Sequence, residues 1–308
     1  MKSAIKTAYL AADGFQDQLI QELNGIQAVH GHLILTAQPL QKTFWAQNVW
    51  LNPVAIAVRS ISDAANQLKS MQRNWWLYSF HLHRRARLIR EQLPHISAKP
   101  LHFPSSLPKT PLGSWTLLDQ NTILASAQCS SLFPNGEIHF AEDKKEPPNR
   151  AYLKLWEALT LAGDHPRPGQ FCIDAGASPG GWTWVAQKLG ARVLSIDRSP
   201  LAPAVSQLPG VTFHKGDAFS LTPDEFRGPG KKIDWLFSDV VCYPEKLCQW
   251  VRMWVESGVC RNFICTLKFQ GDGDYAIAEK FAALPDSRVL HLFHNKHELT
   301  WICLKRPQ

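Results

Sequence analysis

The stretch from Asp174 to Thr183 carries the clearest chemical signal in this sequence of 308 residues. It reads Asp-Ala-Gly-Ala-Ser-Pro-Gly-Gly-Trp-Thr and lies between an apolar, strand-like run and a segment with helical character. In a doubly wound α/β domain, such a turn lies at the carboxyl edge of the first strand, where nucleotide-like ligands bind. Its glycines let the backbone approach a ligand closely because they carry no Cβ. We therefore expect a cofactor site formed by Asp174, Gly176, Ala177, Ser178, Pro179, Gly180, Gly181 and Trp182.

The spacing of the glycines argues against a dinucleotide as this cofactor. Gly176, Gly180 and Gly181 do not follow the G-x-G-x-x-G pattern that holds a pyrophosphate at a helix N-terminus. The carboxylate of Asp174 would repel a pyrophosphate, but it could accept a hydrogen bond from an α-amino group. S-adenosylmethionine has an α-amino group and a cationic sulfonium, and it has no phosphate. The residues therefore favour S-adenosylmethionine.

Acidic residues also follow the next two expected strands. The run 192–196 ends in Asp197, and the run 211–214 leads to Asp217. In a nucleotide-binding fold, Asp197 could accept hydrogen bonds from ribose hydroxyls, and Asp217 could accept one from the adenine amino group. The alternative is that both carboxylates only cap the helices that follow them.

Two further strand ends suggest a reaction centre. The run 233–238 ends in Asp239, and the run 262–267 ends in Lys268. A doubly wound sheet brings the carboxyl ends of its parallel strands to the edge where the cofactor binds. Asp239 and Lys268 would then flank the methyl group, and Asp239 would also border the cofactor.

Four blocks of sequence, in this order, resemble the FtsJ-type ribose 2′-O-methyltransferases. They are R-A-x-x-K-L-x-E from Arg150, D-x-G-A-x-P-G-G-W-T from Asp174, Ser-Asp at 238–239 and Leu-Lys at 267–268. The resemblance implies an α/β fold, with a Rossmann-like class I methyltransferase domain whose mostly parallel seven-stranded sheet has helices on both faces. It implies S-adenosylmethionine as cofactor and ribosomal RNA as substrate, with a cytidine of the large-subunit RNA as target. The family's Lys-Asp-Lys-Glu tetrad corresponds here to Lys154, Asp239, Lys268 and Glu298.

Such a tetrad has a physical rationale. A ribose hydroxyl is a poor nucleophile, and a free lysine with a pKa of about 10.4 is protonated at neutral pH. Burial and the positive charge of Lys154 would have to lower the pKa of Lys268 for it to act as a base. The alternative role for Lys268 is that of a cation that only orients the ribose hydroxyl. Asp239 would orient Lys268, and Glu298 would position Lys154 or the substrate. The alternative for Lys154 is a surface helix residue paired with Glu157.

A charged stretch with two prolines, 142–148, indicates a domain boundary. We expect an N-terminal α/β RNA-binding domain over 1–145 and the methyltransferase domain over 146–308. Within the first, strands are expected at 7–11 and 32–35, with helices over 14–23 and 66–93. The family resemblance implies a THUMP-like module there, trimmed or diverged in this shorter chain.

The segment 69–109 contains eight lysines and arginines and one acidic residue. Trp75, Trp76, Tyr78 and Phe80 are interleaved with these cations, a pattern that favours phosphate contacts and base stacking. The alternative is a solvated helical face whose aromatic side chains point into the core. A net charge of +7 also favours a polyanionic partner.

Seven cysteines occur without any C-x-x-C pair, so the spacing of a structural zinc site is missing. We expect buried free thiols, no metal and a reducing cytoplasm. We find no signal peptide and no apolar run of about 20 residues, and we expect no membrane association. The oligomeric state stays open.

Other functions were weighed against RNA 2′-O-methylation. Adenine amino-methylation would call for an N/D-P-P-Y/F loop after the fourth strand, and carbon-5 methylation for a Pro-Cys nucleophile, a context that Cys242 lacks. Small-molecule O-methylation leaves the basic aromatic segment unexplained. A catalytically inactive RNA-binding or ribosome-assembly factor is the main alternative, along with 2′-O-methylation of another RNA.

Overall fold

The computed structural model describes residues 4–228, 232–269 and 275–305 of the chain. The chain forms two compact units, which are Met1–Leu101 with Leu107–His139 and His102–Ser106 with Phe140–Gln308. The boundary expected after residue 145 therefore lies inside the second unit. The short piece 102–106 packs with the second unit because Phe103 stacks on Trp156, with 5.0 Å between the ring centroids.

The second unit is built on a seven-stranded sheet with the order β12-β11-β10-β13-β14-β16-β15. The first five of these strands are parallel, whereas β16 runs antiparallel to β14 and β15. The mostly parallel sheet expected from the family resemblance is confirmed. Its strands are β10 (Phe171–Ala175), β11 (Arg192–Asp197), β12 (Val211–Lys215), β13 (Ile233–Ser238), β14 (Cys260–Lys268), β15 (Ser287–Leu290) and β16 (Glu298–Leu304).

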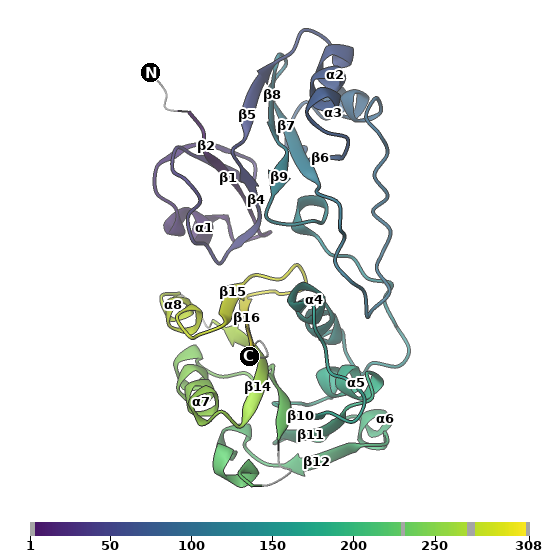
Figure 1. Cartoon of the computed structure of the whole chain (residues 1–308), viewed down its shortest axis with the longest axis vertical. Coiled ribbons are helices and arrows are strands. Elements are labelled where there is room, and N and C mark those ends of the chain that lie inside the picture. The colour runs from purple at the N-terminus through teal and green to yellow at the C-terminus, as the bar shows by residue number, and fades with distance from the viewer. Residues whose placement is uncertain (1–3, 229–231, 270–274, 306–308) are drawn as a thin grey trace. The chain divides into compact units, whose positions relative to one another are not determined.

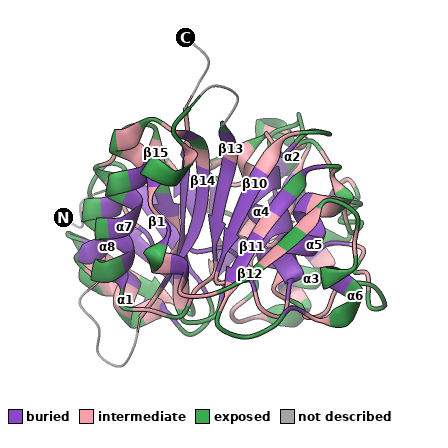
Figure 2. Cartoon of the chain, turned by 90° about the horizontal axis from the view of Figure 1, so that it is seen from below, coloured by how far each residue is buried: buried purple, intermediate pink, exposed green. Residues whose placement is uncertain are grey.

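Helices cover both faces of this sheet, with α4, α5 and α6 on one face and α7 and α8 on the other (Figure 1). The central strands are consequently the most deeply buried part of the unit (Figure 2). Their apolar side chains are removed from water on both faces, as in other parallel sheets. The helices are α4 (Tyr152–Ala162), α5 (Gly181–Lys188), α6 (Pro203–Ser206), α7 (Pro244–Ser257) and α8 (Ile277–Ala282), with short 3-10 helices at Ala218–Ser220 and Pro223–Phe226.

The antiparallel strand β16 brings its first residue to the edge where the parallel strands end. In the register of β14 and β16, Lys268 pairs with Glu298. Because β16 runs against β14, the start of one strand lies beside the end of the other. Glu298 therefore lies at the carboxyl edge although it is the N-terminal residue of its strand.

The first unit contains two sheets, with the orders β2-β3-β1-β4-β9 and β5-β8-β7-β6. Strands β1 and β3 confirm the expectations at 7–11 and 32–35, and α1 (Gln16–Glu22) confirms the first helix. The strands are β1 (Thr7–Ala11), β2 (Ile26–His30), β3 (Leu33–Thr36), β4 (Ala46–Leu51), β5 (Val54–Ala57), β6 (Trp75–Leu77), β7 (Gly113–Asp119), β8 (Thr122–Ser126) and β9 (Gln128–Cys129). A short 3-10 helix follows at Pro134–Gly136.

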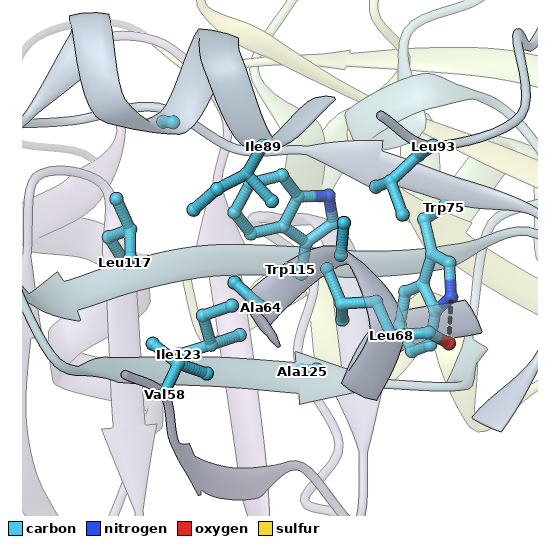
Figure 3. Packing of buried hydrophobic residues seen from close by; sticks show 12 residues of the cluster. Val58, Ala64, Leu68, Trp75, Ile89, Leu93, Trp115, Leu117, Ile123 and Ala125 are labelled. Atoms are coloured by element: carbon cyan, nitrogen blue, oxygen red, sulfur yellow. Dashed lines mark hydrogen bonds between the residues drawn. The ribbon is translucent and has the colours of Figure 1, made fainter. Parts of the chain in front are cut away.

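The continuous helix expected over 66–93 is wrong, because strand β6 separates α2 (Ile61–Met71) from α3 (His83–Arg90). Two adjacent tryptophans favour a strand, and β6 pairs with β7 in parallel. Figure 3 shows Trp75 in the apolar core between these helices and the four-stranded sheet, where its indole N–H donates to the Leu68 carbonyl at 2.8 Å. Trp75 is therefore a core residue, and base stacking is wrong for this position.

Candidate active site

A cavity of about 720 Å³ opens at the carboxyl edge of the seven-stranded sheet. Pro179 and Gly180 belong to the same glycine-rich turn but do not line it, and neither do Lys154 and Glu298. The expected site residues that do line it are Asp174, Gly176, Ala177, Ser178, Gly181, Trp182, Asp197, Asp217, Asp239 and Lys268. The structure thus brings most of the expected cofactor residues together around one space.

Asp174 lines this cavity and has a buried carboxylate oxygen without a hydrogen-bond partner in the described residues. The side chain is 1% exposed, and its Oδ2 accepts a hydrogen bond from the Thr183 hydroxyl at 2.7 Å. Within the described residues no hydrogen bond reaches the buried Oδ1. Burial raises the pKa of Asp174 to about 7. A cationic donor in the cavity would satisfy Oδ1 and favour the ionised carboxylate.

Two glycines let the turn lie against its neighbours. A Cβ on Gly176 would come within 2.6 Å of the Val240 Cβ, and the backbone there has a φ of +82°. A Cβ on Gly181 would collide with Asn149 Oδ1. Glycine is required at Gly176 because its backbone has a positive φ and a Cβ would press on Val240, whereas a Cβ at Gly181 would displace the Asn149 side chain. The turn is thereby held between the loop after β13 and the segment before α4.

The four residues of the expected tetrad meet at the ends of β13 and β14. The Lys154 Nζ lies 2.9 and 2.7 Å from the two carboxylate oxygens of Asp239 and 2.9 Å from Glu298 Oε1. The Lys268 Nζ donates to the backbone carbonyl of Asp239 at 2.6 Å and lies 3.0 Å from its Oδ1. Asp239 therefore holds both lysines. The pairing of Lys154 with Glu157 is wrong, because Lys154 is 9% exposed and bonds to these two carboxylates instead.

Burial and charge oppose each other within this cluster. Burial by itself lowers the pKa of Lys154, but the charges of Asp239 and Glu298 outweigh it and raise the pKa. For Asp239, burial raises the pKa, while Lys154 and Lys268 lower it below the ordinary value. Lys154 is therefore held as an ammonium and Asp239 as a carboxylate at neutral pH.

Residues 147–295 match the model of the FtsJ-like methyltransferase family. This part of the chain is an FtsJ-like methyltransferase domain. Enzymes of this kind take their methyl group from S-adenosylmethionine, which is the cofactor of the domain.

Several curated relatives are named ribosomal RNA large subunit methyltransferase M. The protein from Halorhodospira halophila is 39% identical over 127 residues, which cover 40% of this chain and 36% of the relative. Those from Xylella fastidiosa and Thauera aminoaromatica are 36% and 32% identical, over 50% and 58% of this chain and 46% and 52% of the relatives. The chain thus spans about half the length, or less, of these relatives. Among solved structures, the Methanococcus jannaschii fibrillarin pre-rRNA processing protein is 14% identical with a TM-score of 0.38, over 61% of this chain and 80% of that one.

The cavity of the FtsJ-like domain fits S-adenosylmethionine in its donor and acceptor chemistry. The free Oδ1 of Asp174 suits the α-amino group, and the glycine turn leaves room for close approach. Asp197 and Asp217 line the side of the cavity toward β11 and β12, where they can serve the ribose and the adenine. The carboxylates also provide a negative environment for the sulfonium.

Asp217 also makes the capping contact that was the alternative for it, whereas Asp197 does not cap the helix that follows it. Asp197 accepts from the backbone N–H groups of Ser178 and Ser199, at 3.0 and 2.8 Å. Asp217 accepts from Phe219 N–H at 3.0 Å and is paired with Arg198. The two roles are compatible because both side chains also line the cavity.

Two supporting residues of the FtsJ-like domain were missed in the sequence. Thr266 on β14 donates its hydroxyl proton to Asp239 Oδ1 at 2.6 Å. Glu157, one turn after Lys154 on α4, accepts from the backbone N–H groups of Phe293 and His294 at 2.8 and 3.0 Å. Glu157 is 2% exposed, and these two hydrogen bonds hold the loop that leads to Glu298. The Glu at the end of R-A-x-x-K-L-x-E was the one signal that could have indicated it.

Burial disfavours Cys242, which lines the cavity, as a nucleophile. Burial raises the pKa of the Cys242 thiol to about 11, so the thiolate needed for a nucleophile is scarce at neutral pH. All seven cysteines are free, as expected. In the described part of the chain, no group of three His, Cys, Asp or Glu side chains could hold a metal ion, and no helix is long and apolar enough to cross a membrane.

The basic segment 69–109 lies in the first unit apart from residues 102–106. Arg84, Arg87 and Arg90 are exposed on α3, whose other side buries Ala86 and Ile89. Tyr78 and Phe80 are half-buried, with 6.1 Å between their stacked rings. The cations are therefore available to a partner, whereas the aromatic side chains are divided between core and surface.

Proposed function

We propose that this chain transfers the methyl group of S-adenosylmethionine to a ribose 2′-hydroxyl of RNA, with large-subunit ribosomal RNA as substrate. The observation that carries the proposal is the cluster of Lys154, Asp239, Lys268 and Glu298, of which Asp239 and Lys268 line the cofactor cavity. The names of the curated relatives support ribosomal RNA as the substrate class.

The bound cofactor supplies an electrophilic methyl carbon on a cationic sulfur. The chain must then hold a ribose hydroxyl in line with that carbon and accept its proton as the oxygen–carbon bond forms and the carbon–sulfur bond breaks. We assign the proton to the neutral amine of Lys268, which lines the cavity. Lys154 is unsuited to this role because carboxylate oxygens occupy its ammonium group. It instead offsets the charges of Asp239 and Glu298.

We further propose that the first unit binds the RNA. Arg84, Arg87 and Arg90 form an exposed cationic stripe on α3, and such a stripe suits a phosphate backbone. The affinity of the first unit for RNA should fall steeply as the salt concentration rises, because each neutralised phosphate releases counterions.

The test uses labelled S-adenosylmethionine and total RNA from cells that lack the gene. Wild-type protein and the Lys268→Ala variant are compared, with Lys280→Ala as an exposed-lysine control on α8. Digestion with alkali and nucleases locates the label. We expect label in an alkali-resistant dinucleotide of large-subunit RNA with wild type and control, and none with Lys268→Ala although it binds the cofactor.

Label on a base would refute ribose methylation. Cofactor and RNA binding without any transfer, on naked RNA and on ribosomal particles, would favour the inactive RNA-binding factor.

A further inference from the structure

The loop after β13 exposes two large apolar side chains beside the reaction centre. Val241 is 72% exposed and Tyr243 is 66% exposed. Both line the same cavity as Asp239 and Lys268. Large apolar side chains are more stable when they are buried than when they are in contact with water. Two of them at the rim of a cavity therefore indicate a surface that binds a ligand.

The exposure of Tyr243 comes from a well-anchored backbone. On one side of it, Val240 packs against the Gly176 position of the cofactor turn. On the other, the Tyr243 carbonyl accepts hydrogen bonds from the N–H groups of Lys246 and Leu247 in the first turn of α7. The backbone of Tyr243 is therefore held in place next to the cavity.

The fold itself gains little from a tyrosine at this position. Tyr243 is the N-cap residue of α7, and its side chain makes no capping hydrogen bond. Ser, Thr, Asp or Asn would stabilise the helix more, because each can accept from a free N–H of the first turn. An exposed aromatic ring in place of a capping residue indicates a role in binding.

The surroundings of Tyr243 suit a nucleic acid. Lys246, one turn further along α7, also lines the cavity, and its Nζ lies 4.3 Å from the centroid of the Phe219 ring. The amine of Lys268 lines the same wall. An exposed aromatic ring next to cations is the combination with which proteins stack unpaired bases and hold their phosphates.

We propose that Tyr243, flanked by Val241, is the surface on which a base of the RNA substrate stacks while the ribose of that nucleotide lies beside Lys268. This inference rests on the proposed function and specifies how its substrate is held. A base can stack on this ring only when its nucleotide is unpaired or extruded. The ring would stabilise the extruded base without reading its identity, because every base has a π-face.

The experiment compares Tyr243→Ala and Tyr243→Phe in the full chain, with Met253→Ala as a control. Met253 is a partly exposed apolar residue of α7 that does not line the cavity. Fluorescence anisotropy gives the Kd of a labelled single-stranded RNA of mixed sequence in the presence of S-adenosylhomocysteine. Calorimetry gives the Kd of S-adenosylmethionine. We expect Tyr243→Ala to weaken RNA binding about tenfold or more, with Tyr243→Phe and the control close to wild type and cofactor affinity unchanged in all.

Three results would overturn the proposal. Unchanged RNA affinity in Tyr243→Ala would show that the ring does not contact RNA. An equal loss in Tyr243→Phe would assign the effect to the hydroxyl group rather than to stacking. A loss of cofactor affinity in Tyr243→Ala would make the ring a wall of the cofactor site. If wild type binds RNA but transfers no methyl group, the proposed function fails while the RNA affinities still decide the role of Tyr243. Wild type that binds no RNA refutes both.

Discussion

The buried carboxyl of Asp174 predicts that cofactor binding depends on pH. Burial raises its pKa to about 7, and its free Oδ1 is the acceptor that we assign to the α-amino group of S-adenosylmethionine. Only the ionised carboxylate attracts an ammonium group. The neutral variant Asp174→Asn keeps the shape of the side chain and removes its titration.

The size of the effect follows from the fraction of ionised Asp174. With a pKa of about 7, the carboxyl is almost fully ionised at a pH of about 8 and only about one-tenth ionised at a pH of about 6. Ionisation of Asp174 by itself should therefore make the Kd of the cofactor about tenfold lower at a pH of about 8 than at a pH of about 6. The α-amino group of the ligand titrates near 7.7–8.0 and weakens binding on the alkaline side. The ratio of the wild-type Kd to that of Asp174→Asn cancels this contribution of the ligand.

The same shift affects the stability of the cofactor-free protein. Because the folded state holds the proton of Asp174 more tightly than the unfolded state does, the free energy of unfolding falls as the pH rises from about 4 to about 7. The change of pKa from 3.8 to about 7 corresponds to about 4 kcal/mol. Asp174→Asn should lack this loss and be more stable than wild type at a pH of about 8.

Calorimetric Kd values and urea unfolding, each measured across this range of pH, test both statements. The reasoning is refuted if wild type and Asp174→Asn show parallel pH profiles of cofactor affinity. It is also refuted if the variant binds the cofactor as tightly as wild type at a pH of about 8, where the carboxylate should be ionised.

Three further predictions concern the surroundings of the reaction centre. Lys154→Met should abolish methyl transfer and cost about 3–5 kcal/mol in urea unfolding, because it leaves the buried Glu298 without its cation and removes one of the two lysines that hold Asp239. Lys188→Met, which breaks a half-exposed ion pair, should cost less than about 1 kcal/mol. Equal costs would contradict the buried pairing. Glu157→Gln should lower the free energy of unfolding by about 1–3 kcal/mol. It should also lower kcat and leave the Kd of the cofactor unchanged. An unchanged kcat would show that the loop before Glu298 does not position Glu298 for the reaction. Cys242→Ser should retain methyl transfer, and its loss with intact cofactor binding would point to a cysteine nucleophile and base methylation.

Much of the methyltransferase domain could be predicted because its signals are local. The glycine turn, the acids at the strand ends and the apolar runs between them depend on a few consecutive residues, and they located Asp174, Asp197 and Asp217 along one sheet edge. The mostly parallel seven-stranded sheet and the helices on both of its faces followed from the family resemblance and are confirmed. The predicted helix over 66–93 was wrong because β6, whose two tryptophans favour a strand, pairs with the distant strand β7.

The sequence by itself thus determined which residue types stand at the ends of the strands and that a methyl donor suits them. Only the tertiary structure decided which charges meet. The antiparallel register of β16 brings Glu298 beside Lys268, and the burial of α4 turns Lys154 toward two carboxylates rather than toward Glu157. It also decided that Trp75 is core and that Tyr243 faces solvent. These outcomes depend on contacts between residues far apart in the chain, where burial and charge pairing select the arrangement that leaves the fewest unpaired polar groups.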